Sequence, residues 1–286
     1  MMYAAVLPNL KRTHAAAATV EVIRRLHQMD ALVLMRASDR DPVFKADRFE
    51  TDFAALLKAC TLMIAIGGDG TIIHAARHAA QADRPVLGIN TGHLGFVAEL
   101  EPNELDLLAL LAKGRYSEEK RLLLRATFRD SSGRQRQAEA INDVVLTRGA
   151  TTKILDFAVR FNNTELAHYR ADGLIFSTPT GSTAYSLSAG GPFVAPDIDC
   201  MLLTPICPHS LMSRPVVVGG DARLTAQVTS RSGGDAYLTV DGDDALTLSP
   251  GTTVEVRRSP FTARLIKLKK DSFYTIINQK FAEGRE

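Results

Sequence analysis

Cysteine is scarce in this sequence, and the three that occur are Cys60, Cys200 and Cys207. Their number is odd, and no two of them have the Cys-x-x-Cys spacing of a metal ligand pair. These features indicate neither a disulfide framework nor a zinc ribbon. A reducing compartment suits such a chain, so we expect the protein to be cytoplasmic.

Long hydrophobic runs are also missing. The sequence has no stretch of about 18 consecutive apolar residues, which a membrane-spanning helix requires. Residues 174–196 carry no charge, but their hydroxyls, glycines and prolines predict a loop-rich segment. Residues 1–8 lack the basic start and long apolar core of a signal peptide. We therefore expect neither a membrane partner nor export.

An excess of charge of one sign is absent as well. Lysine and arginine number 34 against 32 aspartates and glutamates, which gives a net charge of +2. A protein that binds along a nucleic-acid backbone needs a basic stripe, so we expect no nucleic-acid partner. With 45% hydrophobic and 23% charged residues the chain is globular rather than disordered. Its 286 residues suit two domains, although one large domain remains open.

The first 120 residues alternate short apolar runs with helical patterns. The apolar runs are residues 3–7, 31–35, 62–66 and 86–89. Residues 15–28 and 103–113 have apolar positions at the helical period. This alternation is typical of βαβ units in a parallel sheet. Residues 37–52 are rich in charge and lack an apolar period, so we expect a mobile or exposed connection there.

After about residue 120 the pattern changes to short strands separated by turns. The predicted strands are residues 122–128, 144–147, 155–161, 224–229, 236–240 and 254–257. Repeated hairpins of this kind predict a mostly antiparallel sheet. We therefore expect an α/β nucleotide-binding domain with a Rossmann-like parallel sheet at residues 1–120 and a β-rich domain at residues 121–264. Residues 272–281 carry too much apolar surface for a loose tail, and we expect the C-terminal segment, about residues 265–286, to pack on the first domain.

A glycine-dense turn between an apolar strand and a helix is the first candidate site. Residues 67–70 are Gly-Gly-Asp-Gly. Glycines let backbone N–H groups approach a ligand, and a helix N-terminus attracts an anion. Gly68 and Gly70 therefore predict a phosphate site. The Lys-Ser/Thr ending of a Walker loop is missing, which excludes that mechanism.

Asp69 has two interpretations. A carboxylate beside phosphates is repulsive unless it accepts a proton from a nucleophile or acts through a metal ion. Aspartate is also among the best helix N-caps, which would make Asp69 structural. Capping alone does not require three glycines around the carboxylate. The composition of the turn therefore favours a ligand site.

A second glycine-rich loop occurs at residues 88–96, after the next predicted strand. Ligands bind open α/β sheets at the carboxyl ends of their strands, so the two loops would line one crevice. Phe96 either meets a ligand or packs in the core. His93 either faces the crevice or is satisfied by backbone.

Two further segments in the second half carry polar groups. Residues 170–192 are dense in hydroxyls, glycine and alanine, which suits a ligand such as ribose or nicotinamide. Their Ser and Thr residues would otherwise cap a helix that starts near Thr183. Asn142 and Asp143 precede an apolar strand, and a carboxylate there can accept two hydrogen bonds from a ribose diol. Asn-Asp is equally an ordinary turn pair.

These segments, in this order, resemble the NAD kinase family over residues 60–215. The resemblance rests on Gly-Gly-Asp-Gly at 67–70, Asn-Thr-Gly-His-Leu-Gly-Phe at 90–96 and Asn-Asp at 142–143. Residues 172–186, Asp-Gly-Leu-Ile-Phe-Ser-Thr-Pro-Thr-Gly-Ser-Thr-Ala-Tyr-Ser, add to it, as do residues 208–215. The first motif alone also occurs in lipid kinases of the diacylglycerol type and in relatives of phosphofructokinase. The set together does not.

The resemblance implies transfer of the γ-phosphoryl of ATP to the 2′-hydroxyl of the adenosine ribose of NAD, which gives NADP. A divalent metal ion, expected to be Mg²⁺, is then bound through the ATP phosphates rather than by a protein metal site. The family fold is a nucleotide-binding α/β domain with a β-rich domain that supplies much of the NAD site. Members are usually homo-oligomers, so the resemblance implies a dimer or tetramer.

The resemblance also assigns residues. Asp69 matches the catalytic proton acceptor, and Phe96 the residue that packs on the adenine. Asn142 and Asp143 match ribose and adenosine contacts. The remaining matches are to dinucleotide contacts, and these are Lys153, Arg170, Asp172, Thr183, Ala184, Tyr185 and Ser188.

This sequence departs from the commonest family pattern in three places. Asp143 stands where many members have Glu, and Ala171 where Gly is frequent. Asp241-Gly242-Asp243 resembles a family Asp-Gly-Gln.

Residues 8–12, after the first strand, have two interpretations. They either contact the ATP phosphates or only form a turn.

Two rival functions follow from the same residues. A lipid kinase would share Gly-Gly-Asp-Gly, but the Asn-Asp pair and the hydroxyl-rich loop speak against it. A non-catalytic NAD- or NADP-binding regulator would keep the pocket, but would gain nothing from a carboxylate facing phosphates.

Overall fold

The computed structural model describes residues 1–92, 95–130, 132–149, 153–210, 212–229, 236–249, 251–270 and 273–283. His93, a candidate site residue, lies outside these ranges. The chain divides into two compact units. Unit 1 comprises Met1–Lys120 and Thr262–Glu286, and unit 2 comprises Arg121–Phe261. The chain passes between the units within strands β6 (Ser117–Arg129) and β17 (Thr253–Lys267).

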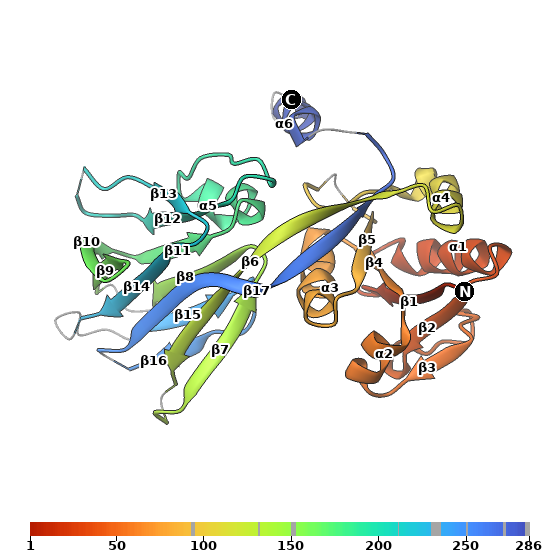
Figure 1. Ribbon diagram of the computed structural model, residues 1–286, viewed down its shortest axis with the longest axis horizontal. Helices are drawn as coiled ribbons and strands as arrows, with labels where there is room; N and C mark the ends of the chain where they lie inside the picture. Colours follow the sequence, from red (N-terminus) through yellow and green to blue (C-terminus); the bar gives the residue numbers. More distant parts are fainter. Residues whose placement is uncertain are drawn as a thin grey trace. The chain divides into compact units, whose positions relative to one another are not determined.

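Unit 1 is built on a parallel sheet in the order β5-β4-β1-β2-β3 (Figure 1). The strands are β1 (Tyr3–Pro8), β2 (Leu32–Arg36), β3 (Arg48–Glu50), β4 (Leu62–Gly67) and β5 (Pro85–Asn90). Every residue of β4 and β5 is buried, which is why both strands are continuous apolar runs in the sequence. Arg264 and Leu265 of β17 add to β5 in parallel.

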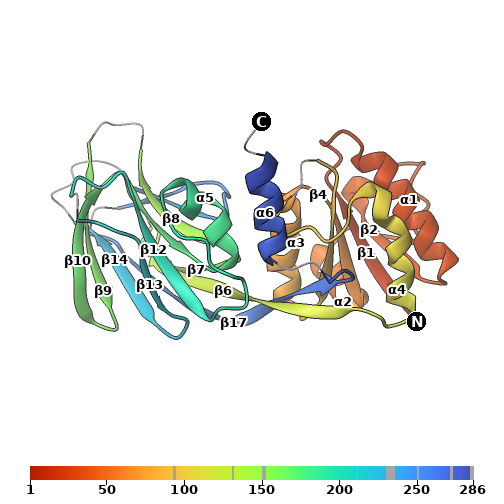
Figure 2. The same cartoon turned by 90° about the horizontal axis from the view of Figure 1, so that it is seen from above.

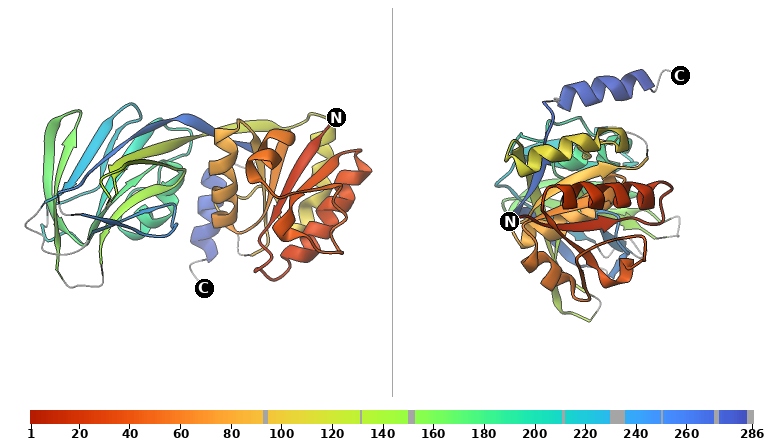
Figure 3. Two further views of the ribbon diagram at one scale, coloured as in Figure 1. Left: turned by 90° about the horizontal axis from the view of Figure 1, so that it is seen from below. Right: turned by 90° about the vertical axis from the view of Figure 1, so that its right-hand side faces the viewer.

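Helices cover both faces of this sheet. The helical segments of unit 1 are α1 (Ala15–Gln28), α2 (Phe53–Ala59), α3 (Asp69–Gln81), α4 (Ala109–Ala112), α6 (Phe273–Glu283), and the 3-10 helices η1 (Ala37–Asp39) and η2 (Pro102–Leu108). Helices α1 and α4 lie over one face (Figure 2), whereas α2 and α3 lie over the other (Figure 3, left). Val22, Ile23 and Leu26 of α1 pack with Leu105 and Leu108 of η2. The expected α/β class is confirmed.

The connection at residues 37–52 is mostly exposed, as expected, but it is not without regular structure. It contains η1 and the short strand β3, which pairs in parallel with β2. Phe44 in the same segment is buried at 4% exposure. Elements of three residues are too short to show a periodic apolar pattern in the sequence. The burial of Phe44 holds this segment against the rest of unit 1.

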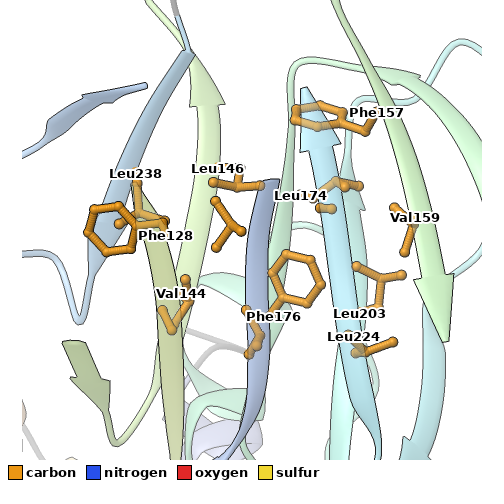
Figure 4. Packing of buried hydrophobic residues seen from close by; sticks show 14 of the residues in the cluster. Phe128, Val144, Leu146, Phe157, Val159, Leu174, Phe176, Leu203, Leu224 and Leu238 are labelled. Carbon is orange, nitrogen blue, oxygen red and sulfur yellow. The ribbon is translucent and has the colours of Figure 1, made fainter. Parts of the chain in front are cut away.

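Unit 2 consists of two sheets that face each other across an apolar core. One sheet has the order β13-β12-β11-β8-β15-β16, and its pairings are antiparallel. The other contains β10, β9, β14 and β17, with β6 beside β17 and β7 beside β6. Phe157 and Phe176, from opposite sheets, are both fully buried in the core (Figure 4). The expected antiparallel β-rich class is confirmed.

The remaining strands of unit 2 have these bounds: β7 (Gln135–Ala140), β8 (Asp143–Arg148), β9 (Leu155–Phe161), β10 (Thr164–Ala171), β11 (Gly173–Ser177), β12 (Cys200–Ile206), β13 (Val216–Gly219), β14 (Arg223–Val228), β15 (Ala236–Val240) and β16 (Leu246–Leu248). Short helices η3 (Thr180–Thr183) and α5 (Tyr185–Ser188) follow β11. The loop-rich segment predicted at residues 174–196 therefore begins with a buried strand. Among the described residues no helix has the length and apolarity needed to cross a bilayer.

Candidate active site

The Gly-Gly-Asp-Gly turn lies at the carboxyl end of β4, where α3 begins. Gly68 is the N-cap and Asp69 is the first residue of the helix. The Asp69 carboxylate accepts hydrogen bonds from the backbone N–H of Phe96, at 2.7 Å, and of Val97, at 3.4 Å. It is therefore held by the loop after β5 rather than by the free N–H groups of its own helix. Simple helix capping does not describe Asp69.

The two glycine-rich loops can approach each other because Gly95 has no side chain. β4 and β5 are neighbours, and Thr91 N donates to Gly67 O at 3.0 Å. A Cβ on Gly95 would overlap the Asp69 carboxylate. Any side chain at position 95 would separate the carboxylate from Phe96 N. The predicted meeting of the two loops at one sheet edge is observed, and half-buried Phe96 lies on it.

Arg12, in the loop after β1, reaches the same edge. A Cβ on Gly68 would lie 3.3 Å from Arg12 Nη2, and one on Gly92 would lie 3.5 Å from Nη1. The guanidinium thus lies against both glycine loops. Arg12 is exposed, and no carboxylate within the described ranges pairs with it. A free cation beside a helix N-terminus suits a phosphate group.

In unit 2, Asn142 and Asp143 form a turn that enters β8, and Asp241 holds this turn. Asp241 Oδ2 accepts from Ile141 N at 3.0 Å, and Oδ1 accepts from the N–H of Asn142 at 2.8 Å and of Asp143 at 3.1 Å. Asp241 N donates in return to Asp143 O at 3.0 Å. Asp241 has φ of 49°, a left-handed conformation that aspartate tolerates better than most residues.

The side chains of this turn are poised for a polar partner. Asp143 is buried at 6% exposure. Burial, followed by the negative charge of Asp241, raises the pKa of Asp143 to about 7. Asn142 Oδ1 is buried and has no hydrogen-bond partner among the described residues. An unpaired buried acceptor beside a buried carboxyl group costs stability, which a ligand's hydroxyls can restore.

The hydroxyl-rich segment packs directly on this turn. Thr178 Oγ1 donates to Ile141 O at 2.6 Å, and Thr178 N donates to Asn142 O at 2.9 Å. Gly181 lies so close to Asn142 O that a Cβ would overlap it. These contacts bring residues 178–181 against residues 141–143, although the sequence separates them by almost forty positions.

Many hydroxyls of the segment bond within the protein rather than to a ligand. Thr180 Oγ1 accepts from buried Arg121 at 3.2 Å, and Ser186 Oγ lies 2.8 Å from Thr204 Oγ1. Thr183 and Ala184 are half-buried, whereas Ser188 and Tyr185, which is 43% exposed, reach the surface. The capping alternative does not describe Thr183, because its Oγ1 donates to Thr180 O at 3.1 Å, whereas a capping hydroxyl accepts from a backbone N–H.

Arg170 and Asp172 precede β11, at the end opposite to Asn142, and Lys153 precedes β9, whose Leu155 pairs with Ala171. Ser177 is opposite Asp143, and Asp172 is five positions earlier in the chain. At about 3.4 Å per residue this is about 17 Å. Asp172 Oδ1 accepts from Arg148 Nε at 2.6 Å, and Arg170 pairs with Asp156 at 3.3 Å. Within one chain the structure does not bring these three residues together with Asn142.

Comparisons with known proteins agree with this geometry. The model of the ATP-NAD kinase N-terminal domain matches residues 9–116, and that of the C-terminal domain matches residues 141–268. The NAD kinase of Symbiobacterium thermophilum is 40% identical over 98% of both chains. That of Moorella thermoacetica is 46% identical over 78% of this chain and 71% of its own.

This chain belongs to the NAD kinase family.

Solved structures of the family share its fold. Yeast NADH kinase complexed with NADH has a TM-score of 0.89 at 25% identity, covering 99% of this chain and 88% of that one. An NAD kinase from Archaeoglobus fulgidus in complex with ATP has a TM-score of 0.72 at 25% identity, covering 99% of each chain. The recognition made from the four motifs is confirmed.

Three residues at these loops have roles that the sequence does not predict. Gly95 lies inside the motif at residues 90–96, but its close approach to Asp69 joins two loops. Asp241 lies in the tripeptide that departs from the family pattern, and its hydrogen bonds reach residues about 100 positions away. Arg12 belongs to residues 8–12, for which the sequence leaves two roles open. In each case the signal is a tertiary contact that local spacing does not encode.

Proposed function

We propose that this NAD kinase family member transfers the γ-phosphoryl of ATP to the 2′-hydroxyl of the adenosine ribose of NAD, giving NADP and ADP. The names of its relatives support the reaction. The observation that carries it is the Asp69 carboxylate, held at the N-terminus of α3 beside the Phe96 loop. A phosphate-ready turn and a proton acceptor then share one sheet edge.

In this reaction Asp69 accepts the proton of the 2′-hydroxyl as that oxygen bonds to the γ-phosphorus. The bond from the γ-phosphorus to the bridging oxygen breaks, and ADP leaves with its electron pair. A carboxylate has about four acceptor positions, so two bonds to backbone N–H groups leave room for a hydroxyl. General-base help contributes about 10²- to 10⁴-fold, and positioning must supply the rest.

A divalent metal ion fits this site only through the nucleotide. No group of three or more His, Cys, Asp or Glu side chains that could hold a metal occurs in the described residues. Mg²⁺ commonly binds nucleotide phosphates with few protein ligands. Bound to ATP, it would neutralise charge on the leaving diphosphate, and the N–H groups around Gly68 would hold the phosphates.

The acceptor contacts extend this proposal. Asn142 Oδ1 and the Asp143 carboxyl would accept or donate to the adenosine hydroxyls of NAD, and Phe96 would pack on its adenine. Thr183, Ala184, Tyr185 and Ser188 would contact the rest of the dinucleotide. We also propose a cytoplasmic homo-oligomer, supported by cysteine use and by the family resemblance.

The test is turnover with purified protein, NAD, ATP and Mg²⁺, with NADP detected by an NADP-specific dehydrogenase. Asp69→Asn should lower kcat by about 10²- to 10⁴-fold, because it removes the proton acceptor. NAD binding, measured by calorimetry, should stay within about threefold.

Full activity of Asp69→Asn would refute the base assignment. Parallel loss of NAD binding and turnover would make Asp69 a binding or structural residue. If the wild type binds NAD but forms no NADP, the result would favour the non-catalytic NAD- or NADP-binding regulator.

A further inference from the structure

The loop that holds Asp69 is closed at its base on strand β5. The chain leaves β5 after Asn90 and lies beside that strand again at Glu99 and Leu100. Asn90 N donates to Leu100 O at 2.8 Å, and the N–H groups of Glu99 and Leu100 both donate to one carbonyl oxygen of β5, at 2.9 Å and 3.2 Å. Only two residues lie between this base and Phe96, whose N–H bonds to Asp69. A displacement of the base therefore reaches Asp69.

The Glu99 side chain ties this base to the end of β17. Its Oε1 accepts hydrogen bonds from Leu268 N at 2.7 Å and from Lys269 N at 2.6 Å, and its Oε2 pairs with the Lys267 ammonium group. Glu99 is 3% exposed, and a carboxylate so deeply buried is stable only when its charge is paired and hydrogen-bonded. All of these residues belong to unit 1. The buried carboxylate therefore holds the base of the loop to a segment 169 and 170 positions later in the chain.

Packing alone does not hold this loop, because one side of it borders a cavity. The cavity has a volume of about 540 Å³, and its lining includes Gly95, Ala98 and Glu99 from the loop and Ile276 from helix α6. Gly95 has no side chain and Ala98 only a methyl group, so neither fills this space. The hydrogen bonds at the base therefore contribute rigidity that close packing does not supply here.

We propose that Glu99 is a positioning residue for phosphoryl transfer. By fixing the base of the loop to residues 267–269, it keeps Phe96 N and Val97 N where they orient the Asp69 carboxylate toward the 2′-hydroxyl. Glu99 acts through this loop rather than on the reacting atoms, and its role rests on the proposed kinase function. A displacement of a catalytic group by about 1 Å can cost about 100-fold in rate, which sets the size of the expected effect.

A double-mutant cycle on the full chain tests this role through the kinetics of NADP formation. Glu99→Ala should lower kcat about 100-fold and leave KM for ATP and for NAD within about threefold, because the substrates keep their own contacts. Glu99→Gln keeps the Oε1 acceptor for both N–H groups, so it should lower kcat only about threefold. In the Asp69→Asn background, Glu99→Ala should lower kcat by less than about twofold, since the proton acceptor that it positions is already gone.

Two further variants complete the set. Glu99→Asp shortens the side chain by one methylene group and should lower kcat about tenfold, which keeps the test available if Glu99→Ala does not fold. Glu104→Gln is the matched control, because Glu104 also pairs with Lys269, through two contacts of 3.0 Å, but lies outside the loop. This variant should keep kcat within about twofold of the wild type.

Hydrogen exchange gives a readout that needs no turnover. The amides of Phe96 and Val97 should exchange at least about tenfold faster in Glu99→Ala or Glu99→Asp than in the wild type or in Glu104→Gln. Unchanged exchange at these amides, or an equal loss of kcat from Glu99→Ala with and without Asp69→Asn, would overturn the proposal. A wild type that forms no NADP, with faster exchange in the Glu99 variants, would leave Glu99 assigned to positioning the loop and refute the kinase function instead.

Discussion

At the scale of single residues, the turn before β8 brings two aspartates with different surroundings close together. Asp143 and Asp241 lie in one turn, and Asp143 is almost fully buried. The Asp241 carboxylate accepts hydrogen bonds from three backbone N–H groups. Burial and the negative charge of Asp241 raise the pKa of Asp143 and so favour its neutral form.

The pKa of Asp143 predicts a pH dependence of stability. Because burial raises this pKa to about 7 from the ordinary value of 3.8, the unfolded chain ionises first as the pH rises. The free energy of unfolding should therefore fall between pH 4 and 7, by up to about 1.4 kcal/mol per pH unit from this group. The contribution is complete below pH 4 and lost above about pH 7.

Urea denaturation across this range tests the effect. Asp143→Asn, which cannot ionise, should lack this part of the slope, whereas Asp244→Asn, at an exposed position, should retain it. Equal slopes for wild type and Asp143→Asn would show that Asp143 titrates near its ordinary pKa in the folded protein.

At the scale of elements, the turn that we propose to contact NAD depends on hydrogen bonds between the end of β15 and the start of β8. Asp241 follows β15 directly and binds the backbone of residues 141–143. Thr178, after β11, bonds to the other side of the same turn. The positions of Asn142 and Asp143 are therefore set by two loops from neighbouring strands.

Asp241→Asn tests these hydrogen bonds. An amide oxygen carries no net charge and its NH₂ group cannot accept, so the free energy of unfolding should fall by about 2–3 kcal/mol. KM for NAD should rise about tenfold with little change in KM for ATP. Loss of the Asp241 charge should also lower the pKa of Asp143, which moves the pH dependence of KM for NAD to lower pH.

Asp244→Asn serves as the control for this variant too. If Asp241→Asn lowers stability but leaves KM for NAD and its pH profile unchanged, Asp241 contributes to folding and not to NAD recognition.

At the scale of the whole molecule, each of the two units has an apolar core of its own. Unit 1 relies on buried strands between two helical layers, and unit 2 on two sheets with an apolar core. Glu99, 3% exposed, accepts from the N–H groups of Leu268 and Lys269 and pairs with Lys267, which anchors the end of β17 in unit 1.

Metal removal should therefore abolish turnover without affecting the fold. EDTA is expected to stop NADP formation reversibly, and Mg²⁺ in excess should restore it, because the ion acts on the ATP phosphates. Tm without nucleotide should change by less than about 1 °C, since no protein metal cage occurs in the described residues. A large drop in Tm on chelation would reveal a structural ion.

The sequence predicts those elements whose signal lies in a single local segment. Continuous apolar runs predicted β1, β2, β4 and β5, because strands buried on both faces have no polar positions. The helical period predicted α1 at Ala15–Gln28 with its observed bounds. The strand patterns did not predict β7, β10, β11, β12 and β13. Strands β7 and β10 are largely exposed, β13 lies at a sheet edge, and β11 lies in the segment rich in glycine and hydroxyl residues. Strand β12 is a buried apolar run that the sequence analysis did not single out.

The sequence by itself determined the family and the α/β and β-rich classes, because the order of the motifs and the change of apolar period near residue 120 are local features of the chain. The tertiary structure alone decided which hydroxyls are already bonded, that Asp69 is held from the Phe96 loop, and that Asp241 clamps a turn 98 to 100 positions away. It also placed Arg12 against both glycine loops. Such contacts join segments distant in the chain, and their energy depends on burial and geometry that no local pattern records.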